Sequence, residues 1–257
     1  MKISYLSDIH ADFWVPFTFN QIKWEKRTKE FIEKLIETDE GERDILCLSG
    51  DYSHFNVQTM WILETFSQHY KQVFFTYGNH CMYLVSKSQE DKYNGHSQNR
   101  IDELYSKSIE LKNVHPLFTD ETFIYQGVTF GGNPMWYPIS TTEQKMFFNN
   151  ISNDSRLIKG VDIHLEHKKS IANYSSMMNR GIDVMISHVP LCHLRSHEKY
   201  ASTACYFTQV DVLPKHVVMG HSHERAIYKK AGSSLYMNCL GYPHDSLGKP
   251  DIRNFTI

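Results

Sequence analysis

Five short apolar runs, each ending in side chains that can bind a metal, are the feature that most constrains the fold of this chain. Each run has the length and composition of a buried strand. The polar endings are Asp8-Ile9-His10, Gly50-Asp51, Gly78-Asn79-His80, Ser187-His188 and Gly220-His221-Ser222-His223. Helical patterns separate the runs, which indicates an α/β architecture. Because ligands of such sheets bind at the carboxyl ends of strands, we expect the five endings to gather at one edge.

The remaining pattern extends this α/β reading. The expected strands cover residues 3–6, 45–48, 73–77, 184–186 and 217–219, and the segments 122–131 and 234–240 are read as strands of a second, stacked sheet. Helices are expected at residues 19–37, 57–70, 97–111 and 162–179. Thr141-x-x-Gln144 has the pattern of a capping box that opens a further helix. No Pro/Gly/Ser-rich linker divides the chain, so residues 1–257 are predicted to form a single domain.

Composition narrows the functional classes. The 257 residues carry a formal charge of -2, without the basic surplus of proteins that coat duplex nucleic acid, so nucleic acid is not the favoured partner. No stretch of about 18 apolar residues and no signal-peptide pattern is present, which predicts a soluble protein without a membrane partner. The five cysteines form no CxxC pair, so we expect reduced thiols and a cytoplasmic location.

The residue types at the strand endings predict a metal centre. Two of the endings hold candidate ligands two residues apart, and such residues point to the same side of an extended chain. The candidate ligands are Asp8, His10, Asp51, Asn79, His188, His221 and His223. Seven ligands are too many for one tetrahedral zinc site and suit two cations that share a carboxylate. The mixed oxygen and nitrogen set favours two divalent transition-metal ions, with manganese first and iron, zinc, cobalt or nickel as alternatives.

The five endings, read as SDIH, SGDY, YGNHC, ISHVP and GHSH, resemble the five-block pattern of the calcineurin-like metallophosphoesterases: D-x-H, G-D, G-N-H-D/E, H and G-H-x-H. They occur in the family's order and spread over residues 8–223. The resemblance implies a four-layer αββα sandwich, in which two stacked mixed β-sheets are flanked by helices and the metal site lies at the strand C-terminal ends. It also implies in-line attack on phosphorus by a metal-bridging hydroxide.

The same resemblance implies a role for each block, with Asp51 as the bridge between two metals. One metal would be held by Asp8, His10, Asp51 and His223. The other would be held by Asp51, Asn79, His188 and His221. His80 would be the catalytic residue, facing the phosphate to stabilise the transition state or to protonate the leaving oxygen.

The chain departs from the family pattern at three places. The second block reads GDYSHF and lacks the arginine of the GDxVDRG sequence, so a protein Ser/Thr phosphatase of that branch is not expected. His188 is followed by Val-Pro where many bacterial relatives have a second histidine. Cys81 stands where the family has a carboxylate, and a thiol is a weak donor and acceptor. We therefore expect His80 to be a poorer acid unless another carboxylate supplies the contact; the alternative is that Cys81 is a small buried thiol with no role.

Side chains near the blocks are candidates for substrate binding. His54 lies three residues after Asp51, and His193 and His197 follow His188. Phe13 and Trp14 are candidates to flank the site or stack on a base, although packing is the favoured interpretation.

The leading hypothesis is dinuclear metal-dependent hydrolysis of phosphate esters, with a small phosphomonoester or phosphodiester such as a nucleotide as the substrate. The alternatives are a metal-dependent nuclease acting on DNA or RNA, and a non-catalytic scaffold on the same fold. The natural substrate, the choice between monoesterase and diesterase, the metal, the oligomeric state and the conformation of residues 82–121 and 133–182 stay open at the level of sequence.

Overall fold

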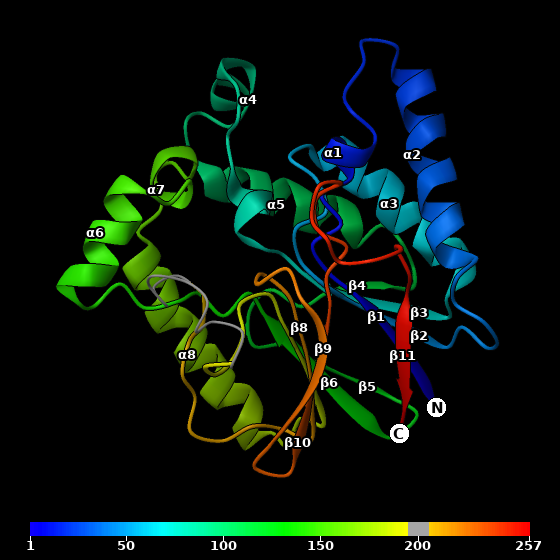
Figure 1. The fold of residues 1–257 in the computed structure, drawn as a ribbon, viewed down its shortest axis with the longest axis vertical. Coiled ribbons are helices and arrows are strands. Elements are labelled where there is room, and N and C mark those ends of the chain that lie inside the picture. Colours follow the sequence, from blue (N-terminus) through cyan, green and yellow to red (C-terminus); the bar gives the residue numbers. More distant parts are fainter. Residues whose placement is uncertain (195–205) are drawn as a thin grey trace.

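Two β-sheets pack face to face in the computed structural model, which describes residues 1–194 and 206–257. Helices cover the outer faces of both sheets (Figure 1). This arrangement confirms the predicted α/β fold, a four-layer αββα sandwich with two mixed sheets. The termini lie side by side, and the amino group of Met1 donates a hydrogen bond to the carbonyl oxygen of Ile257 at 2.9 Å.

The first sheet carries three of the five metal-capable endings. Its strand order is β11-β1-β2-β3-β4. The strands are β1 (Lys2–Leu6), β2 (Ile45–Ser49), β3 (Gln72–Thr76), β4 (Val114–Pro116) and β11 (Arg253–Thr256). β1 to β4 are parallel, and β11 joins β1 antiparallel. The parallel arrangement brings the carboxyl ends of β1, β2 and β3 to one edge.

The second sheet carries the other two endings. Its order is β5-β6-β7-β8-β10-β9. The strands are β5 (Thr122–Tyr125), β6 (Val128–Asn133), β7 (Val184–Ser187), β8 (His216–Met219), β9 (Arg225–Lys230) and β10 (Ser233–Asn238). Since β7 and β8 are parallel, their metal-capable endings also lie side by side.

The segment 122–131, expected as one strand, is an antiparallel hairpin of β5 and β6. Gln126 and Gly127 connect the two strands with φ angles of 48° and 80°. Two consecutive residues in the left-handed region are typical of a tight two-residue hairpin turn. The expectation was wrong because the Gln126-Gly127 pair, which interrupts the apolar run, is a turn and not part of a continuous strand.

A shared apolar core joins the two sheets. Alternate residues of the strands point into this layer, because successive side chains of a strand face opposite ways. The buried members are Ile3, Tyr5, Ile45, Cys47, Phe74, Leu117, Phe130, Val184, Ile186, Val218 and Tyr236. Phe74 of β3 and Phe130 of β6 stack with ring centroids 4.4 Å apart, which fixes the two sheets against each other.

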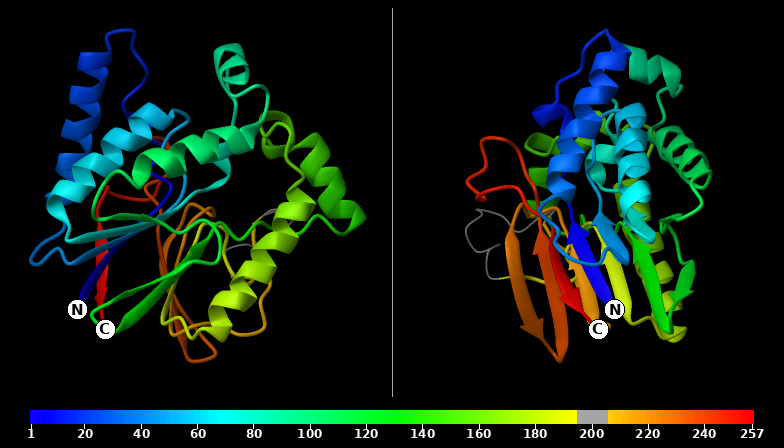
Figure 2. Two further views of the ribbon diagram at one scale, coloured as in Figure 1. Left: turned by 180° about the vertical axis from the view of Figure 1, so that it is seen from behind. Right: turned by 90° about the vertical axis from the view of Figure 1, so that its right-hand side faces the viewer.

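The helices lie outside the sheets. α2 (Gln21–Ile36), α3 (Asn56–His69) and α5 (Ser97–Ser108) pack over the first sheet, while α8 (Ile163–Asn179) runs beside the second (Figure 2). The remaining short helices are α1 (Ala11–Trp14), the 3-10 turn η1 (Asn79–Met82), α4 (Lys87–Lys92), α6 (Thr142–Asn150) and α7 (Asp154–Leu157). The predicted capping box at Thr141 and Gln144 opens α6 as expected.

Three further expectations concern the chain as a whole. Among the described residues, no helix combines the length and the apolarity needed to cross a membrane. The described cysteines, Cys47, Cys81, Cys192 and Cys239, are buried and unpaired with one another. The organisation of residues 1–257 as one domain stays a prediction.

Candidate metal centre

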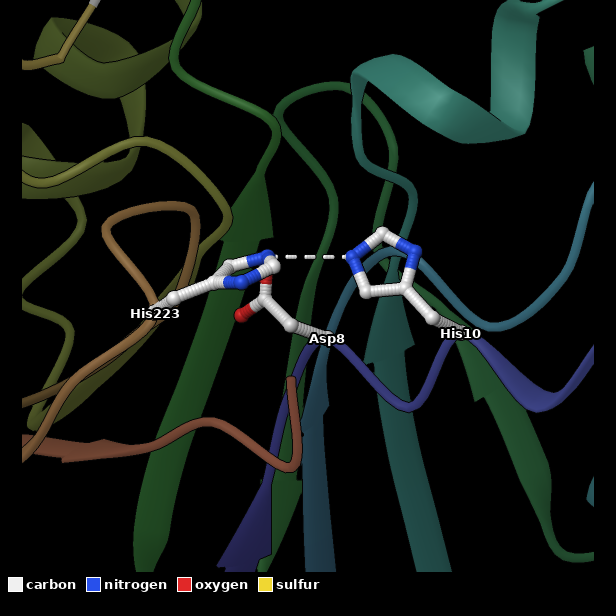
Figure 3. Close-up of side chains that lie close together, drawn as sticks. All are labelled: Asp8, His10 and His223. Atoms are coloured by element: carbon white, nitrogen blue, oxygen red, sulfur yellow. Dashed lines mark hydrogen bonds and ion pairs between the residues drawn. The ribbon is translucent and has the colours of Figure 1, made fainter. Parts of the chain in front are cut away.

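The five strand endings meet at one edge of the sandwich. His and Asp side chains from these endings form three overlapping groups whose ligand atoms lie within 4.8 Å of one another. The groups are Asp8, His10 and His223; His10, Asp51 and His80; and Asp8, Asp51 and His188. Figure 3 shows the first of them, with the His10 and His223 rings facing each other beside the Asp8 carboxylate. Asp8, His10 and Asp51 each belong to two groups, so the three form one continuous cluster.

Two focal points stand out within this cluster. At the first, Nε2 of His10 lies 3.1 Å from Nε2 of His223, which in turn lies 3.7 Å from Oδ1 of Asp8. The second focal point surrounds Nε2 of His188. That atom lies 2.9 Å from Oδ1 of Asn79, 3.2 Å from Nδ1 of His221 and 3.2 Å from Oδ2 of Asp51. The structure therefore brings all seven candidate ligands together in two neighbouring sets.

The supporting hydrogen bonds fit this donor set to cations. Nδ1 of His188 donates to the carbonyl oxygen of Ser49 at 2.8 Å, and Nδ1 of His223 donates to Oδ2 of Asp245 at 2.7 Å. A proton held at Nδ1 leaves the lone pair of Nε2 directed into the centre, as is usual for histidines that bind metals. In the metal-free chain, one proton on Nε2 of His10 satisfies its 3.1 Å contact with Nε2 of His223, and a cation bound by both atoms would take the place of that proton.

Asn79 is oriented in a similar way. Its Nδ2 donates to Oδ1 of Asp154 at 2.8 Å, so its Oδ1 points to His188. Asp154 is buried in α7, where it also accepts hydrogen bonds from the hydroxyls of Tyr83 and Tyr137. The segment between β6 and β7 thus holds a candidate ligand in place from outside the five motifs.

The backbone at the ligands is strained. Five of the candidate ligands have positive φ angles, which side chains other than glycine adopt at a cost. They are Asp8 at 49°, His10 at 44°, Asp51 at 56°, His221 at 69° and His223 at 47°. Because this conformation is unfavourable in isolation, the surrounding packing must maintain it.

Glycines make the close packing of the ligands possible. A Cβ at Gly78 would lie 2.2 Å from Oδ1 of Asp51. A Cβ at Gly220 would lie 2.6 Å from Oδ2 of Asp8, and one at Gly50 would lie 2.6 Å from Nδ1 of His188. The glycines of the motifs therefore provide the room in which the ligands approach the neighbouring strand ends.

Burial and charge control protonation in the centre. Burial acts to raise the pKa of Asp51, but the nearby imidazoles, His188 first, hold it well below its usual range. Burial likewise acts to lower the pKa of His188, but Asp51 outweighs it and raises that pKa to about 9. Burial lowers the pKa of His80 to about 4, and it lowers the pKa of His10 well below its usual range. In the metal-free protein, the proton on His188 thus provides the positive charge that neutralises Asp51.

The thiol of Cys81 lies against the metal ligands. It is buried, and its Sγ lies 4.0 Å from Oδ1 of Asp51, an oxygen that also accepts a hydrogen bond from the backbone N–H of His80 at 2.9 Å. Burial raises the pKa of Cys81 to about 11, so the group is a neutral thiol. His80 finds its ring contact at His54 instead, where Nδ1 of His80 and Nε2 of His54 are 2.9 Å apart.

The other substrate-binding candidates lie in different environments. The ring of His193 packs edge-on against Phe207, and His197 lies outside the described residues. Trp14 packs on Phe31, and its Nε1 donates to the carbonyl oxygen of Gly241 at 3.0 Å. Phe13 is 44% exposed beside the centre.

Several residues of the centre carry no motif signal. Asp12, Arg100, Asp154, Tyr242 and Asp245 support the candidate ligands or the loops that carry them. Asp12 alone adjoins a block, two residues after His10, and that proximity was the one available signal. The others reach the site only through the tertiary fold.

The space at Gly78 yields a first prediction. Gly78→Ala should lower Mn²⁺ affinity by about 10- to 100-fold, because the new Cβ displaces the Asp51 carboxylate. Isothermal titration calorimetry measures this. Gly232→Ala is the control, since its added Cβ meets nothing within 4 Å although its φ of +82° imposes backbone strain. Unchanged affinity in Gly78→Ala would contradict the placement of Asp51.

The pKa of His188 yields a second prediction. Since it is about 9, His188 is protonated at pH 7, and a cation requires the neutral ring. Mn²⁺ binding should therefore release about one proton at pH 7 and about half a proton at pH 9, with affinity rising with pH over this range. Calorimetry in buffers of different ionisation enthalpy counts the protons. A proton count that does not change with pH would contradict this assignment.

Comparison with known proteins gives the site its family. The sequence matches the model of the family described as calcineurin-like phosphoesterase over residues 1–225. No curated protein matches the sequence. In structure the chain is similar to phosphopantetheinyl hydrolase from Mycobacterium tuberculosis, with a TM-score of 0.63, 14% identity, and coverage of 99% of this chain and 95% of that one. It also matches a protein of unknown function from Aquifex aeolicus, with a TM-score of 0.32, 11% identity, and coverage of 82% and 88%.

At 14% identity, the likeness to the mycobacterial hydrolase shows a shared fold. The family match carries the chemistry, because it spans the five motifs whose side chains converge at the strand ends. The chain belongs to the calcineurin-like phosphoesterase family of metal-dependent hydrolases that act on phosphoester bonds.

Proposed function

We propose that this protein hydrolyses a small phosphate monoester or diester with two divalent transition-metal ions bound at the strand ends. The observation that carries the proposal is the pair of focal points at Nε2 of His10 and Nε2 of His188, each surrounded by further oxygen and nitrogen donors. Seven donors from five separate strand endings meet there, and buried hydrogen bonds orient several of them.

In this proposal Asp8, His10 and His223 would hold one ion, Asn79, His188 and His221 would hold the other, and Asp51 would serve both. Two such ions supply positive charge for the phosphoryl oxygens and lower the pKa of water that acts as the nucleophile. The carboxylates return only two negative charges, so the centre keeps a positive surplus for a phosphate group. Manganese is the ion we propose first, since oxygen and imidazole ligands both suit it.

His80 is the proposed catalytic side chain. It belongs to a group with His10 and Asp51, and its ring centroid lies 4.7 Å from that of His10. This proximity supports a role for the His80 imidazole beside the proposed metal site of His10, in which we propose that His80 is not itself a ligand. His80 would contact the phosphoryl group or give a proton to the leaving oxygen.

An aromatic wall beside the centre supports a substrate with a flat apolar part. Tyr242 stacks on His10 with centroids 4.5 Å apart and lies 4.9 Å from His223. Phe13 packs edge-on against Tyr242 at 4.7 Å and exposes 44% of its surface. Such rings offer contact area to a base or another planar group. A nucleotide-like ester, rather than a nucleic acid polymer, also agrees with the near-neutral charge of the chain.

The buried reduced thiols support a cytoplasmic location as part of the same proposal.

Hydrolysis of model esters tests the function. With Mn²⁺, the protein should hydrolyse p-nitrophenyl phosphate or bis-p-nitrophenyl phosphate. Asp51→Asn should lower kcat/KM by more than about 100-fold, beyond the usual effect of removing a residue that merely supports a ligand. Asp91→Asn, which alters an exposed ion pair with Lys87, is the control and should keep wild-type activity.

The two alternatives predict other results. A nuclease would cleave single-stranded or duplex DNA or RNA and leave both small esters intact. A non-catalytic scaffold would bind well under one equivalent of Mn²⁺ and hydrolyse nothing. Activity that survives Asp51→Asn would contradict the proposed dinuclear centre.

A further inference from the structure

A line of three side chains runs from the edge of the centre to His80. Oδ2 of Asp12 lies 2.7 Å from Nδ1 of His54, and Nε2 of His54 lies 2.9 Å from Nδ1 of His80. We infer that Asp12, acting through His54, is a positioning residue that fixes the tautomer and the orientation of His80. The catalytic consequence of this arrangement rests on the function proposed above, but the arrangement itself does not.

The carboxylate of Asp12 grips His54 at two points. Oδ1 accepts a hydrogen bond from the backbone N–H of His54 at 3.2 Å while Oδ2 contacts the ring. Both side chains are about nine-tenths buried, with 10% and 11% of their surfaces exposed. Water therefore competes little for these hydrogen bonds, and the two-point contact sets the rotation of the His54 ring.

The carboxylate of Asp12 determines which atom donates and which accepts in each hydrogen bond of this line. Oδ1 of Asp12 accepts the backbone N–H of His54 and Oδ2 lies 2.7 Å from Nδ1 of the same residue, so the carboxylate is the acceptor at both contacts. Nδ1 of His54 must then carry the proton, which leaves Nε2 of His54 as the acceptor toward His80. Nδ1 of His80 must in turn be the donor, and Nε2 of His80 is the atom left for the phosphate side.

The backbone around the two rings is held as well. Arg100 is buried and donates to the carbonyl oxygens of Ser53, His80 and Tyr83 at 2.8, 3.0 and 2.7 Å. It thereby ties the loop after β2 to the loop after β3. The ring of Tyr83 packs on both histidines, with centroids 5.7 Å from His54 and 4.3 Å from His80. The distance between the two imidazoles is thus fixed independently of Asp12.

His54 and Asp12 together replace the contact that a carboxylate at position 81 would give to His80. Cys81 turns to Asp51, whereas the contact to His80 comes from His54 and the negative charge comes from Asp12. Both ring nitrogens of His54 are engaged in this line. Its role is therefore to hold His80, and we prefer this role to the substrate binding expected from its place in the sequence.

Asp12→Asn should exchange donor and acceptor in both side-chain hydrogen bonds of this line. The backbone N–H of His54 needs an acceptor, so the amide oxygen of the new side chain should take the place of Oδ1. The amide nitrogen then faces Nδ1 of His54 and donates to it. His54 must carry its proton on Nε2 and donate to Nδ1 of His80, whose proton moves to Nε2.

Long-range ¹H–¹⁵N NMR of the full-length protein reads this tautomer directly, both metal-free and loaded with diamagnetic Zn²⁺. His80→Gln assigns the His80 signals by their disappearance. The inference predicts a proton on Nδ1 of His80 in the wild type and on Nε2 in Asp12→Asn. Glu33→Gln is the matched control, because Glu33 contacts His69 in a similar carboxylate–histidine pair on α2 and α3. It should leave the His80 signals unchanged.

Two NMR outcomes would overturn the inference: a wild-type His80 with its proton on Nε2, or a His80 tautomer that is the same in Asp12→Asn. Neither readout needs hydrolysis, so a protein without esterase activity would contradict the proposed function and leave this test decisive.

Kinetics then distinguishes positioning from general damage. In the wild type, Nδ1 of His80 keeps its proton while Nε2 takes up and delivers the proton that the leaving oxygen needs. In Asp12→Asn, Nδ1 accepts from His54, so the ring holds only the Nε2 proton, and giving it up would leave an imidazolate. Asp12→Asn and His54→Gln should therefore lower kcat about 10- to 100-fold for phenyl phosphate, whose leaving group needs a proton, with little change in KM. The loss should be several-fold smaller for p-nitrophenyl phosphate, whose leaving group needs little help. Equal losses on both esters would mean that the line supports folding or metal binding only, and would overturn the positioning role.

Discussion

The rest of the structure depends on one constraint: carboxylates and imidazoles are buried together at the ends of five strands. Asp8, Asp51 and His188 are almost fully inaccessible to water. Burying such groups is costly unless each finds a partner. In the metal-free chain, a proton on His188 compensates Asp51, and in the proposed active state two cations would do so for the whole cluster.

Much of the surrounding structure holds this cluster in place despite the free-energy cost of burying its charged side chains. Five ligands keep left-handed backbone angles that are unfavourable in isolation. Glycines open the space that the ligands occupy, and the buried Arg100 joins two of the ligand-bearing loops through backbone carbonyls. The parallel strands of both sheets bring the endings to one edge, and the aromatic stack of Phe74 and Phe130 holds the sheets together. Fold stability and the geometry of the centre are therefore coupled.

Local signals in the sequence predicted the α/β fold and named seven candidate ligands, and the family resemblance implied the four-layer sandwich. Apolar runs that end in Asp, His or Asn report strand and ligand together, and the order of the five motifs adds the family. The hairpin at Gln126 was missed because the Gln126-Gly127 pair was not read as a turn between two apolar runs. Asp154 and Asp245 were missed because each acts across the fold, more than 20 residues from the ligand it orients. Cys81 stands where the family has a carboxylate, and this raised the question of which side chain contacts His80 instead. Only the tertiary contacts of Asp12 and His54 suggest an answer.

The central claim is that two cations occupy the two focal points with Asp51 between them. Anomalous diffraction at the manganese edge, from crystals grown with Mn²⁺, tests it most directly. The account predicts two peaks about 3.5–4 Å apart, one beside Nε2 of His10 and His223 and the other beside Nε2 of His188, with the Asp51 carboxylate bridging them. A single peak, or two peaks bound by other side chains, would contradict it.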